Sequence, residues 1–282
     1  MNFKAVNRNA QSAGSSIEPA IEPISEPTVE STIESTIEHS YPSEPLTLRS
    51  VAQVIGVGYL ASMGVLIAVG FLLTRPLKTS GIVRWDERVV QYFADHRTQS
   101  LTELSAFWSR SADAPSIIAI ALVVGIVLAI RRHWREVIWL AVIVPTELGF
   151  FLTVSYAVGR SRPDVVHLGS VPSTGSFPSG HVAVTIVLYG TIAMILSRHS
   201  HSSIVVRVLA LISWAWTLIA ASFVGWARMY RGMHHPFDVA AGALLGCAVL
   251  YVGVCAFTRS MTDRSHPVSR PKLAVVSNPT DA

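Results

Sequence analysis

Residues 136–158 read EVIWLAVIVPTELGFFLTVSYAV, and the next five, 159–163, read GRSRP. The first stretch is long and apolar enough to form a helix that crosses the roughly 30 Å hydrocarbon core of a membrane. Five further apolar blocks lie at approximately 51–74, 115–130, 181–197, 204–226 and 236–258. Of all residues, 50% are hydrophobic and only 14% are charged, well below the charged fraction of a soluble domain. The sequence therefore predicts an all-α, polytopic membrane bundle of six helices.

The residues outside these blocks divide the chain into regions. Residues 1–48 carry glutamate at a period of four residues, together with prolines that forbid a regular helix, so we expect a disordered acidic tail. Residues 49–258 form the predicted six-helix domain. Within it, residues 75–114 are polar with an amphipathic pattern, which predicts one or two short helices lying at the membrane surface. Residues 259–282 are polar and are predicted to form a C-terminal tail.

The charged residues indicate how the domain lies in a membrane. The net charge is +4, but the basic residues flank the apolar blocks instead of forming one face, so we expect no nucleic-acid partner. Of the 22 basic residues, 12 fall on the side of the two termini, three of them in the short turn RRHWR at 131–135. The positive-inside rule then predicts both termini in the cytoplasm and all the motifs described below on the outer side. We expect an integral protein of the plasma membrane.

Three polar motifs lie at the ends of apolar blocks. They are Gly159–Pro163, reading GRSRP; Pro178–His181, reading PSGH; and Arg228–Asp238, reading RMYRGMHHPFD. The first two lie in the loop between the third and fourth blocks, and the third lies in the turn between the fifth and sixth. All three are therefore on one side of the predicted bundle, and we expect them to form a single site at its outer face.

The residue types in these motifs suit the binding of a phosphate group. Arginine binds phosphate oxygens through a planar fork that stays charged. The motifs supply four such candidates, Arg160, Arg162, Arg228 and Arg231. Ser179 is expected near the N-cap of a helix, and Gly180 lets the backbone approach a ligand closely, so the N–H groups there would point at an anion.

Two histidines and an aspartate are candidates for covalent chemistry at phosphorus. His234 and Asp238 are four residues apart, and Pro236 between them suits the first turn of a helix. Both side chains are therefore predicted to lie on one helical face. The carboxylate would accept the imidazole N–H and leave the other ring nitrogen free to act as a nucleophile. His181 would then be available to donate a proton to the leaving oxygen.

Neither a metal nor a cofactor is expected. The pair His234–His235 has no clear third and fourth ligand nearby, and the arginines would repel a cation. Cys247 and Cys255 lie eight residues apart in one apolar block, too few and too colinear for a zinc site or a disulfide framework.

One acidic residue lies inside an apolar block. Glu147 is in the middle of 136–158, where a carboxylate is costly and is often functional. Two alternatives stay open: the side chain pairs with a motif arginine in the bundle interior, or it bonds to a neighbouring helix.

The ordered motifs resemble those of the type 2 phosphatidic acid phosphatase (PAP2) superfamily. Its signatures are a lysine, six residues, then Arg-Pro; Pro-Ser-Gly-His; and Ser-Arg, five residues, His, three residues, Asp. The second and third match here in order, except that Ala227 stands in place of the serine. The first matches at Arg162-Pro163, but the lysine position is Ser155. The resemblance covers about 51–258, including the six-helix layout.

This resemblance implies a metal-independent lipid phosphatase with a phosphohistidine intermediate. It implies that His234 attacks phosphorus, that Asp238 orients it and that His181 protonates the leaving group. Arg162 and Arg228, with the backbone of Ser179 and Gly180, would hold the phosphoryl oxygens. We further hypothesise that one of the two additional arginines substitutes for the missing lysine; these are Arg160 and Arg231.

The resemblance also suggests the substrates, which are lipids bearing a phosphate or diphosphate. Candidates are a polyprenyl diphosphate such as a cell-wall carrier lipid, phosphatidic acid, and phosphatidylglycerol phosphate. The carrier lipid is preferred by family analogy and by the outward orientation of the site. Two alternatives stay open: a lipid phosphotransferase, and a catalytically degenerate protein that binds or transports lipid phosphates, which the loss of the lysine at Ser155 would favour. The sequence does not indicate the oligomeric state.

Overall fold

The computed structural model of the chain describes residues 48–200 and 203–262, and every regular element within these ranges is a helix. The predicted tails at 1–48 and 259–282 therefore lie almost entirely outside the described residues. The helices are α2 (Leu48–Thr74), α3 (Gly81–Asp95), α4 (Gln99–Ser111), α5 (Ala114–Ile130), α6 (Trp134–Val158), α7 (Gly180–Arg198), α8 (Ile204–Tyr230) and α9 (Pro236–Thr262).

The six predicted apolar blocks each fall within one helix, namely α2 and α5 to α9. Five of these helices are long and apolar enough to cross a membrane. The sixth, α5, has only 17 residues, but it counts as part of a span if it is joined to α4, from which it is bent by 52°. The prediction of an integral membrane protein with an all-α fold is confirmed.

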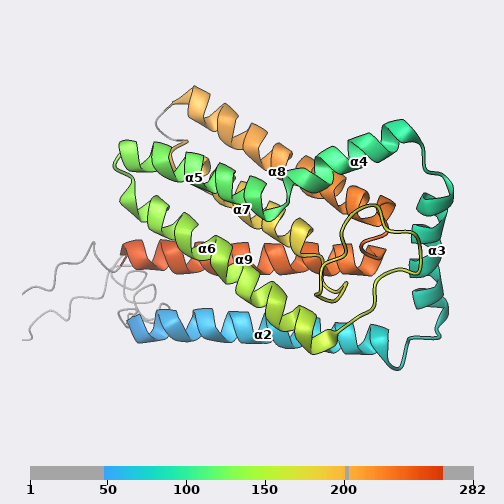
Figure 1. Cartoon of the computed structure of the whole chain (residues 1–282). Helices are drawn as coiled ribbons and strands as arrows, with labels where there is room; N and C mark the ends of the chain where they lie inside the picture. Colours follow the sequence, from blue (N-terminus) through green and yellow to red (C-terminus); the bar gives the residue numbers. More distant parts are fainter. Residues whose placement is uncertain (1–47, 201–202, 263–282) are drawn as a thin grey trace, which may run out of the picture. The chain divides into compact units, whose positions relative to one another are not determined.

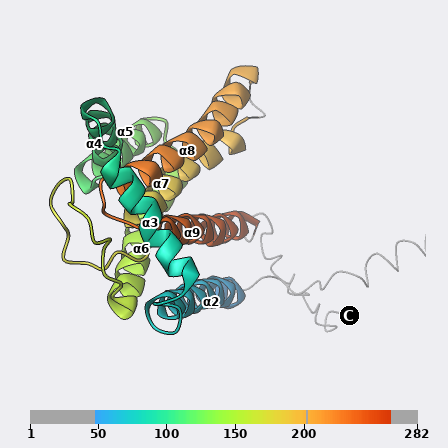
Figure 2. The ribbon, with the colours of Figure 1, turned by 90° about the vertical axis from the view of Figure 1, so that its right-hand side faces the viewer.

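The motifs gather at one end of this helical bundle. In Figure 1, α3 lies across that end, and the connections from α6 to α7 and from α8 to α9 lie beside it. Figure 2 looks onto this end, with α3 crossing in front of the other helices. The first residues of α7, Gly180 and His181, begin here, and α7 has 56% of its apolar stretch buried, against 17% for α2 and for α8. The motif Pro178–His181 therefore leads into the most enclosed span.

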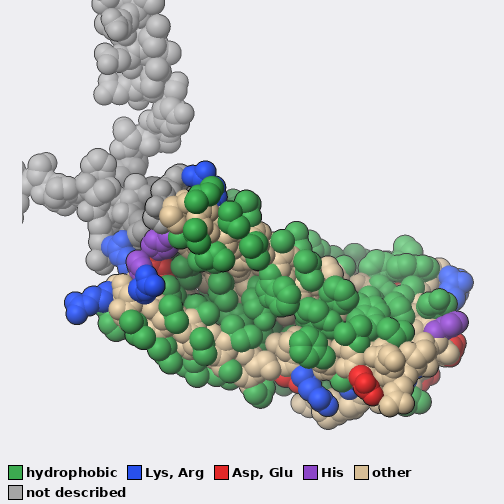
Figure 3. All heavy atoms as spheres, turned by 90° about the horizontal axis from the view of Figure 1, so that it is seen from above, with side chains coloured by type: hydrophobic (Ala, Val, Ile, Leu, Met, Phe, Trp, Pro, Cys, Tyr) green, Lys and Arg blue, Asp and Glu red, His purple; other side chains and the backbone are tan. Residues whose placement is uncertain are grey.

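The outer surface of the long helices is apolar. Leu60, Leu218 and Tyr251 are 69%, 71% and 71% exposed, and they belong to α2, α8 and α9. In the face that Figure 3 shows, hydrophobic side chains cover the middle of the molecule, and most of the visible basic side chains lie toward its two ends. An apolar surface of this extent suits contact with lipid tails.

Small residues let α9 approach α7 closely. A Cβ atom on Gly246 would lie 2.8 Å from the carbonyl oxygen of Ala183, and one on Gly242 would overlap the carbonyl of Ser179. Such small residues are typical of helix contacts in membranes. At the motif end, the backbone N–H of Ser179 donates to the carbonyl oxygen of Asp238 at 2.9 Å. The second and third motifs are therefore fixed to each other by their backbones.

The region 75–114 forms two short helices, α3 and α4, as its amphipathic pattern predicts. Helix α4 packs along α8, where the rings of Trp108 and Phe223 stack with centroids 4.9 Å apart. The hydroxyl of Tyr230, at the end of α8, accepts the backbone N–H of Thr98 at 2.9 Å. This segment therefore supports the turn that carries the third motif.

Candidate active site

One cavity of about 460 Å³ brings the three motifs together. Its polar lining includes Arg162 from the first motif, Gly180 and His181 from the second, and Arg228 and His234 from the third. The rest of its wall is mostly apolar and comes largely from α5 and α6. Two separate loops thus meet at one site, as the positions of the motifs predict.

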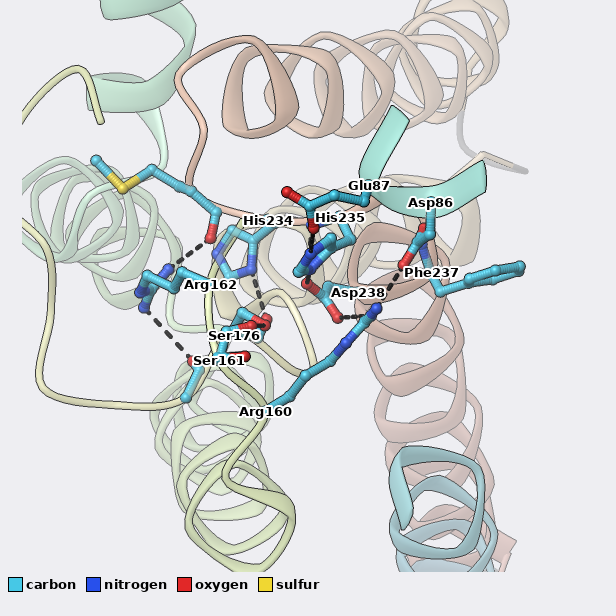
Figure 4. Close-up of polar contacts among 12 residues, drawn as sticks. Asp86, Glu87, Arg160, Ser161, Arg162, Ser176, His234, His235, Phe237 and Asp238 are labelled. Carbon is cyan, nitrogen blue, oxygen red and sulfur yellow. Dashed lines mark hydrogen bonds and ion pairs between the residues drawn. The ribbon is translucent and has the colours of Figure 1, made fainter. Parts of the chain in front are cut away.

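The ring of His234 is held so that one nitrogen stays free. Its Nδ1 lies 2.6 Å from the carbonyl oxygen of Ser176 (Figure 4). A carbonyl only accepts hydrogen bonds, so Nδ1 carries the proton and Nε2 keeps a lone pair. The side chain is 3% exposed, and burial, followed by the positive charges of Arg228 and Arg162, holds the pKa of His234 well below its ordinary value. His234 is therefore a neutral imidazole, the form that can act as a nucleophile.

The contacts of Asp238 differ from the prediction that it accepts the N–H of His234. Its Oδ1 accepts from Arg160 at 2.6 Å, and its Oδ2 accepts the backbone N–H of His235 at 2.8 Å and Nδ1–H of the same residue at 3.0 Å. The prediction assumed that both residues lie in one helix. Because α9 begins only at Pro236, His234 precedes the helix, and the four-residue spacing no longer places the two side chains on one face.

A chain of charged side chains ties α3 to the motifs (Figure 4). Arg160 lies 2.6 Å from both Asp86 and Asp238, and His235 Nε2 lies 2.8 Å from Glu87. Although burial opposes the charge on both bases, the nearby carboxylates raise the pKa of Arg160 and of His235 above their ordinary values. Both side chains are therefore bases that these carboxylates favour in the charged form.

Arg162 and Arg228, the two arginines that line the cavity, use Nη atoms in hydrogen bonds to the protein and leave their Nε–H donors without a partner among the described residues. Arg162 donates from Nη1 to the carbonyl of Met233 at 2.7 Å and from Nη2 to the carbonyl of Thr174 at 3.2 Å. Arg228 donates from Nη1 to the hydroxyl of Ser109 at 2.9 Å. Within the described part of the chain, the Nε atoms of both arginines are buried without a hydrogen-bond partner. Buried donors of this kind are costly unless a ligand satisfies them.

The turn before α7 offers a further donor. Ser179 is the N-cap of α7, as predicted, but its backbone N–H is already bonded to Asp238 and is not free for an anion. Its buried Oγ has no partner among the described residues. The next residue, Gly180, lines the cavity, and a Cβ there would lie 3.0 Å from the ring of Phe151. An anion at this point would therefore meet the start of a helix, which attracts negative charge.

Comparison with known proteins identifies the family. Residues 138–262, which contain all three motifs, match the family model of the PAP2 superfamily. The chain contains a PAP2 superfamily domain.

Two proteins with similar sequences are named as phosphatases. An undecaprenyl-diphosphatase from Sulfolobus acidocaldarius is 27% identical over 161 residues, which cover 48% of this chain and 71% of that one. A probable diacylglycerol pyrophosphate phosphatase from Schizosaccharomyces pombe is 31% identical over 129 residues, or 34% of this chain and 44% of that one.

A solved PAP2 structure shares the fold. It is a phosphatidylglycerolphosphate phosphatase from Bacillus subtilis, with a TM-score of 0.58 and 20% identity. The match covers 74% of this chain and 99% of that one.

In this PAP2 protein, one partner of a motif histidine was missed from the sequence. Nε2 of His181 lies 2.8 Å from Oδ1 of Asp113, the residue just before α5. An aspartate directly before an apolar block suggests an N-cap, but the side chain of Asp113 makes no capping bond. Its carboxylate instead fixes the direction of the His181 ring.

Arg160 and Arg231, the two proposed substitutes for the missing lysine, lie outside the lining of the cavity. Ser155 is buried, with its Oγ 3.4 Å from the carbonyl of Gly175. Arg160 is bound by two carboxylates, and Nη1 of Arg231 lies 3.4 Å from the hydroxyl of Ser105. Neither arginine is among the residues that line the cavity. Arg160 is held by two buried carboxylates, and Arg231 lies just past the end of α8, so that phosphate binding by either arginine stays a prediction.

A separate cluster has the composition of a metal site. His133, Glu136 and His199 have ligand atoms within 4.8 Å of one another, at the ends of α6 and α7 that lie away from the motifs. The same turns carry several arginines, whose charge disfavours a cation. These are Arg131, Arg132, Arg135 and Arg198.

Proposed function

We propose that this PAP2 protein is a metal-independent phosphatase that hydrolyses a lipid phosphate or diphosphate through a phosphohistidine on His234. The observation that carries the proposal is the shared cavity. It joins a neutral, oriented imidazole, two fixed guanidinium groups with unsatisfied Nε–H donors, and a largely apolar wall. An amphiphilic phosphate ester matches this lining, with its phosphate at the arginines and its apolar chain against the apolar wall.

In the proposed reaction, Nε2 of His234 attacks phosphorus and the bond from phosphorus to the leaving oxygen breaks. His181 gives a proton to that oxygen. Water then attacks the phosphohistidine, His181 takes its proton, and the P–N bond breaks to release phosphate. Arg162 and Arg228 neutralise charge on the phosphoryl oxygens in both steps.

Asp238 acts in this proposal as a positioning residue. It holds the backbone N–H of His235, next to the nucleophile, and pairs with Arg160. The backbone carbonyl of Arg160 accepts from the N–H of Ser176, whose own carbonyl orients His234. The carboxylate thus supports the nucleophile through neighbouring groups.

The proposed location is the plasma membrane. The distribution of basic residues supports an orientation with the cavity on the outer side and both termini in the cytoplasm. The substrate would enter from the outer leaflet, with its phosphate at the motif end of the bundle and its apolar part between α5 and α6.

One observation favours a second candidate. Ser155 replaces a cation of the family pattern, which suits a protein that binds or carries lipid phosphates without cleaving them. The His181–Asp113 and His234–Ser176 hydrogen bonds support the enzyme, since binding alone does not require oriented imidazoles.

The function is tested by measuring inorganic phosphate released by detergent-purified protein in excess EDTA. The substrates are farnesyl diphosphate, dioleoyl phosphatidate and phosphatidylglycerol phosphate, and the His234→Ala protein serves as the blank. Release from at least one lipid is expected. Tight binding with no release from any of them would overturn the enzyme in favour of the binding protein, and transfer of phosphate to an added alcohol would indicate a phosphotransferase.

The pH dependence of kcat/KM provides a separate prediction. His234 must be neutral to attack, and burial with the two arginines lowers its pKa below the ordinary 6.5. As pH falls, the wild-type rate should therefore persist past 6.5 and decline only at lower pH. A pH profile whose acidic midpoint lies at or above 6.5 would contradict a neutral His234 nucleophile.

A further inference from the structure

Glu147 is the one acidic side chain among the residues that line the cavity. It lies in the middle of α6 and is 2% exposed. Its Oε1 has no hydrogen-bond partner among the described residues, and no ion pair found there includes it. Neither alternative considered from the sequence, an arginine partner or a bond to a neighbouring helix, accounts for this oxygen. A polar group left unpaired in an apolar interior costs free energy, which indicates that a ligand satisfies it.

The position of Glu147 along α6 places it close behind the phosphate end of the cavity. Phe151, one turn later in the helix, lies against Gly180 at the start of α7. Ser155, a further turn on, lies at the level of the loop that carries the first motif. Since a helical turn rises about 5.4 Å, Glu147 is about one turn deeper in the bundle than the predicted anion position.

The surroundings of Glu147 in the cavity are otherwise apolar. Val144, Pro145 and Leu148 lie beside it on α6, and the opposite walls include Ile117 on α5 and Val184 on α7. The cavity therefore has a cationic end, then one carboxyl group, then hydrocarbon. A ligand that fits this order carries a phosphate, a hydrogen-bonding group a few bonds away, and an apolar chain.

We propose that Glu147 forms a specificity subsite for the ester-linked glycerol backbone of a glycerolipid phosphate. A neutral carboxyl group can donate its O–H to an ester carbonyl, and the ester carbonyls of such a lipid lie a few bonds from the phosphate. The prenyl chain of an isoprenyl phosphate has no acceptor at this depth. The subsite thus favours glycerolipid phosphates over isoprenyl monophosphates, and it rests on the proposed function.

The test compares two lipids that differ only in the carbonyl groups. Dioleoyl phosphatidate and its dioleyl ether analogue are assayed in the same detergent with wild type, Glu147→Leu and Glu147→Gln. We expect wild-type kcat/KM to be about three- to tenfold higher for the diacyl lipid, the usual contribution of one hydrogen bond. Glu147→Leu should lose this preference, because its kcat/KM falls for the diacyl lipid and not for the ether lipid. Glu147→Gln should keep most of it, because its amide N–H can still donate.

Two results would overturn the subsite: equal wild-type rates for the two lipids, or a loss in Glu147→Leu that is the same for both. Farnesyl phosphate is a third substrate, and any change of its hydrolysis in Glu147→Leu should match the change for the ether lipid, because neither molecule carries an ester carbonyl. The ratio of the two dissociation constants is also measured with His234→Ala protein, which holds lipid without turnover. A diacyl preference in binding with no release by wild type would remove the proposed function and keep the subsite. Phosphate release by wild type without a diacyl preference would keep the proposed function and remove the subsite.

Discussion

Replacing His234 by alanine is expected to lower kcat/KM for lipid phosphate hydrolysis by at least about 10⁴-fold, because covalent catalysis loses its nucleophile. The ring is buried, is oriented by the carbonyl of Ser176 and keeps Nε2 free at the cavity. No other imidazole there has this arrangement, since Nε2 of His181 is bonded to Asp113. The measurement is phosphate release at saturating and subsaturating lipid.

The adjacent histidine is a matched control for this substitution. His235 differs by one position, and its ring bonds Asp238 and Glu87 and is not among the residues that line the cavity. His235→Ala should therefore reduce activity far less than His234→Ala. Brief incubation with ³²P-labelled lipid should also leave an acid-labile label on wild type and on His235→Ala. A labelled His234→Ala protein would show that the nucleophile is another residue, and an unlabelled His235→Ala protein would contradict the assignment of His235 as the control.

The fold could be predicted largely from the boundaries of the apolar segments in the sequence. Each of the six apolar blocks became one helix, and the alternation of polar and apolar residues in 75–114 produced α3 and α4. These features are local, since the length of an apolar run and the periodicity of its residues depend little on the rest of the chain. The same locality predicted the N-cap at Ser179 and the helix start at Pro236.

The partners of the site residues depend instead on contacts between distant segments. Asp113 reaches His181 across 68 positions, and Arg160 reaches Asp86 across 74. Nothing in the spacing of the motifs indicates that α3 would supply two carboxylates. Once Asp86 and Asp238 lie beside Arg160, this arginine balances two buried negative charges, and its removal would leave them uncompensated. Arg160 is therefore held in place by these two carboxylates.

The placement of α3 explains why part of the site lies outside the three motifs. Asp86 also accepts the backbone N–H of Phe237 at 2.9 Å, so this helix contacts the first turn of α9 directly. Glu87, the next residue, bonds the ring of His235. The amphipathic segment thus serves to fix the loop that carries His234, a role that its sequence pattern does not indicate.

Replacing Arg228 by methionine is expected to lower kcat by about 10²–10³-fold, the usual effect of losing one donor to a developing charge. Arg228 lines the cavity with its Nε–H unsatisfied, so methionine removes the charge from the phosphoryl group while keeping an extended side chain. Its positive charge also helps to lower the pKa of His234, so the acidic limb of the pH profile should move toward 6.5 in the variant. A loss through misfolding would not produce that shift.

Arg231→Met is the control, because Arg231 lies three positions later and contacts Ser105 outside the cavity. It should change kcat by less than tenfold and leave the pH profile in place. Arg228→Lys should recover only part of the activity, since an ammonium group keeps the charge but lacks the planar fork that fits two phosphate oxygens. If Arg231→Met lowered kcat as much as Arg228→Met, the phosphate would be bound on the side of α8 that faces α4, and the assignment of the cavity would be wrong.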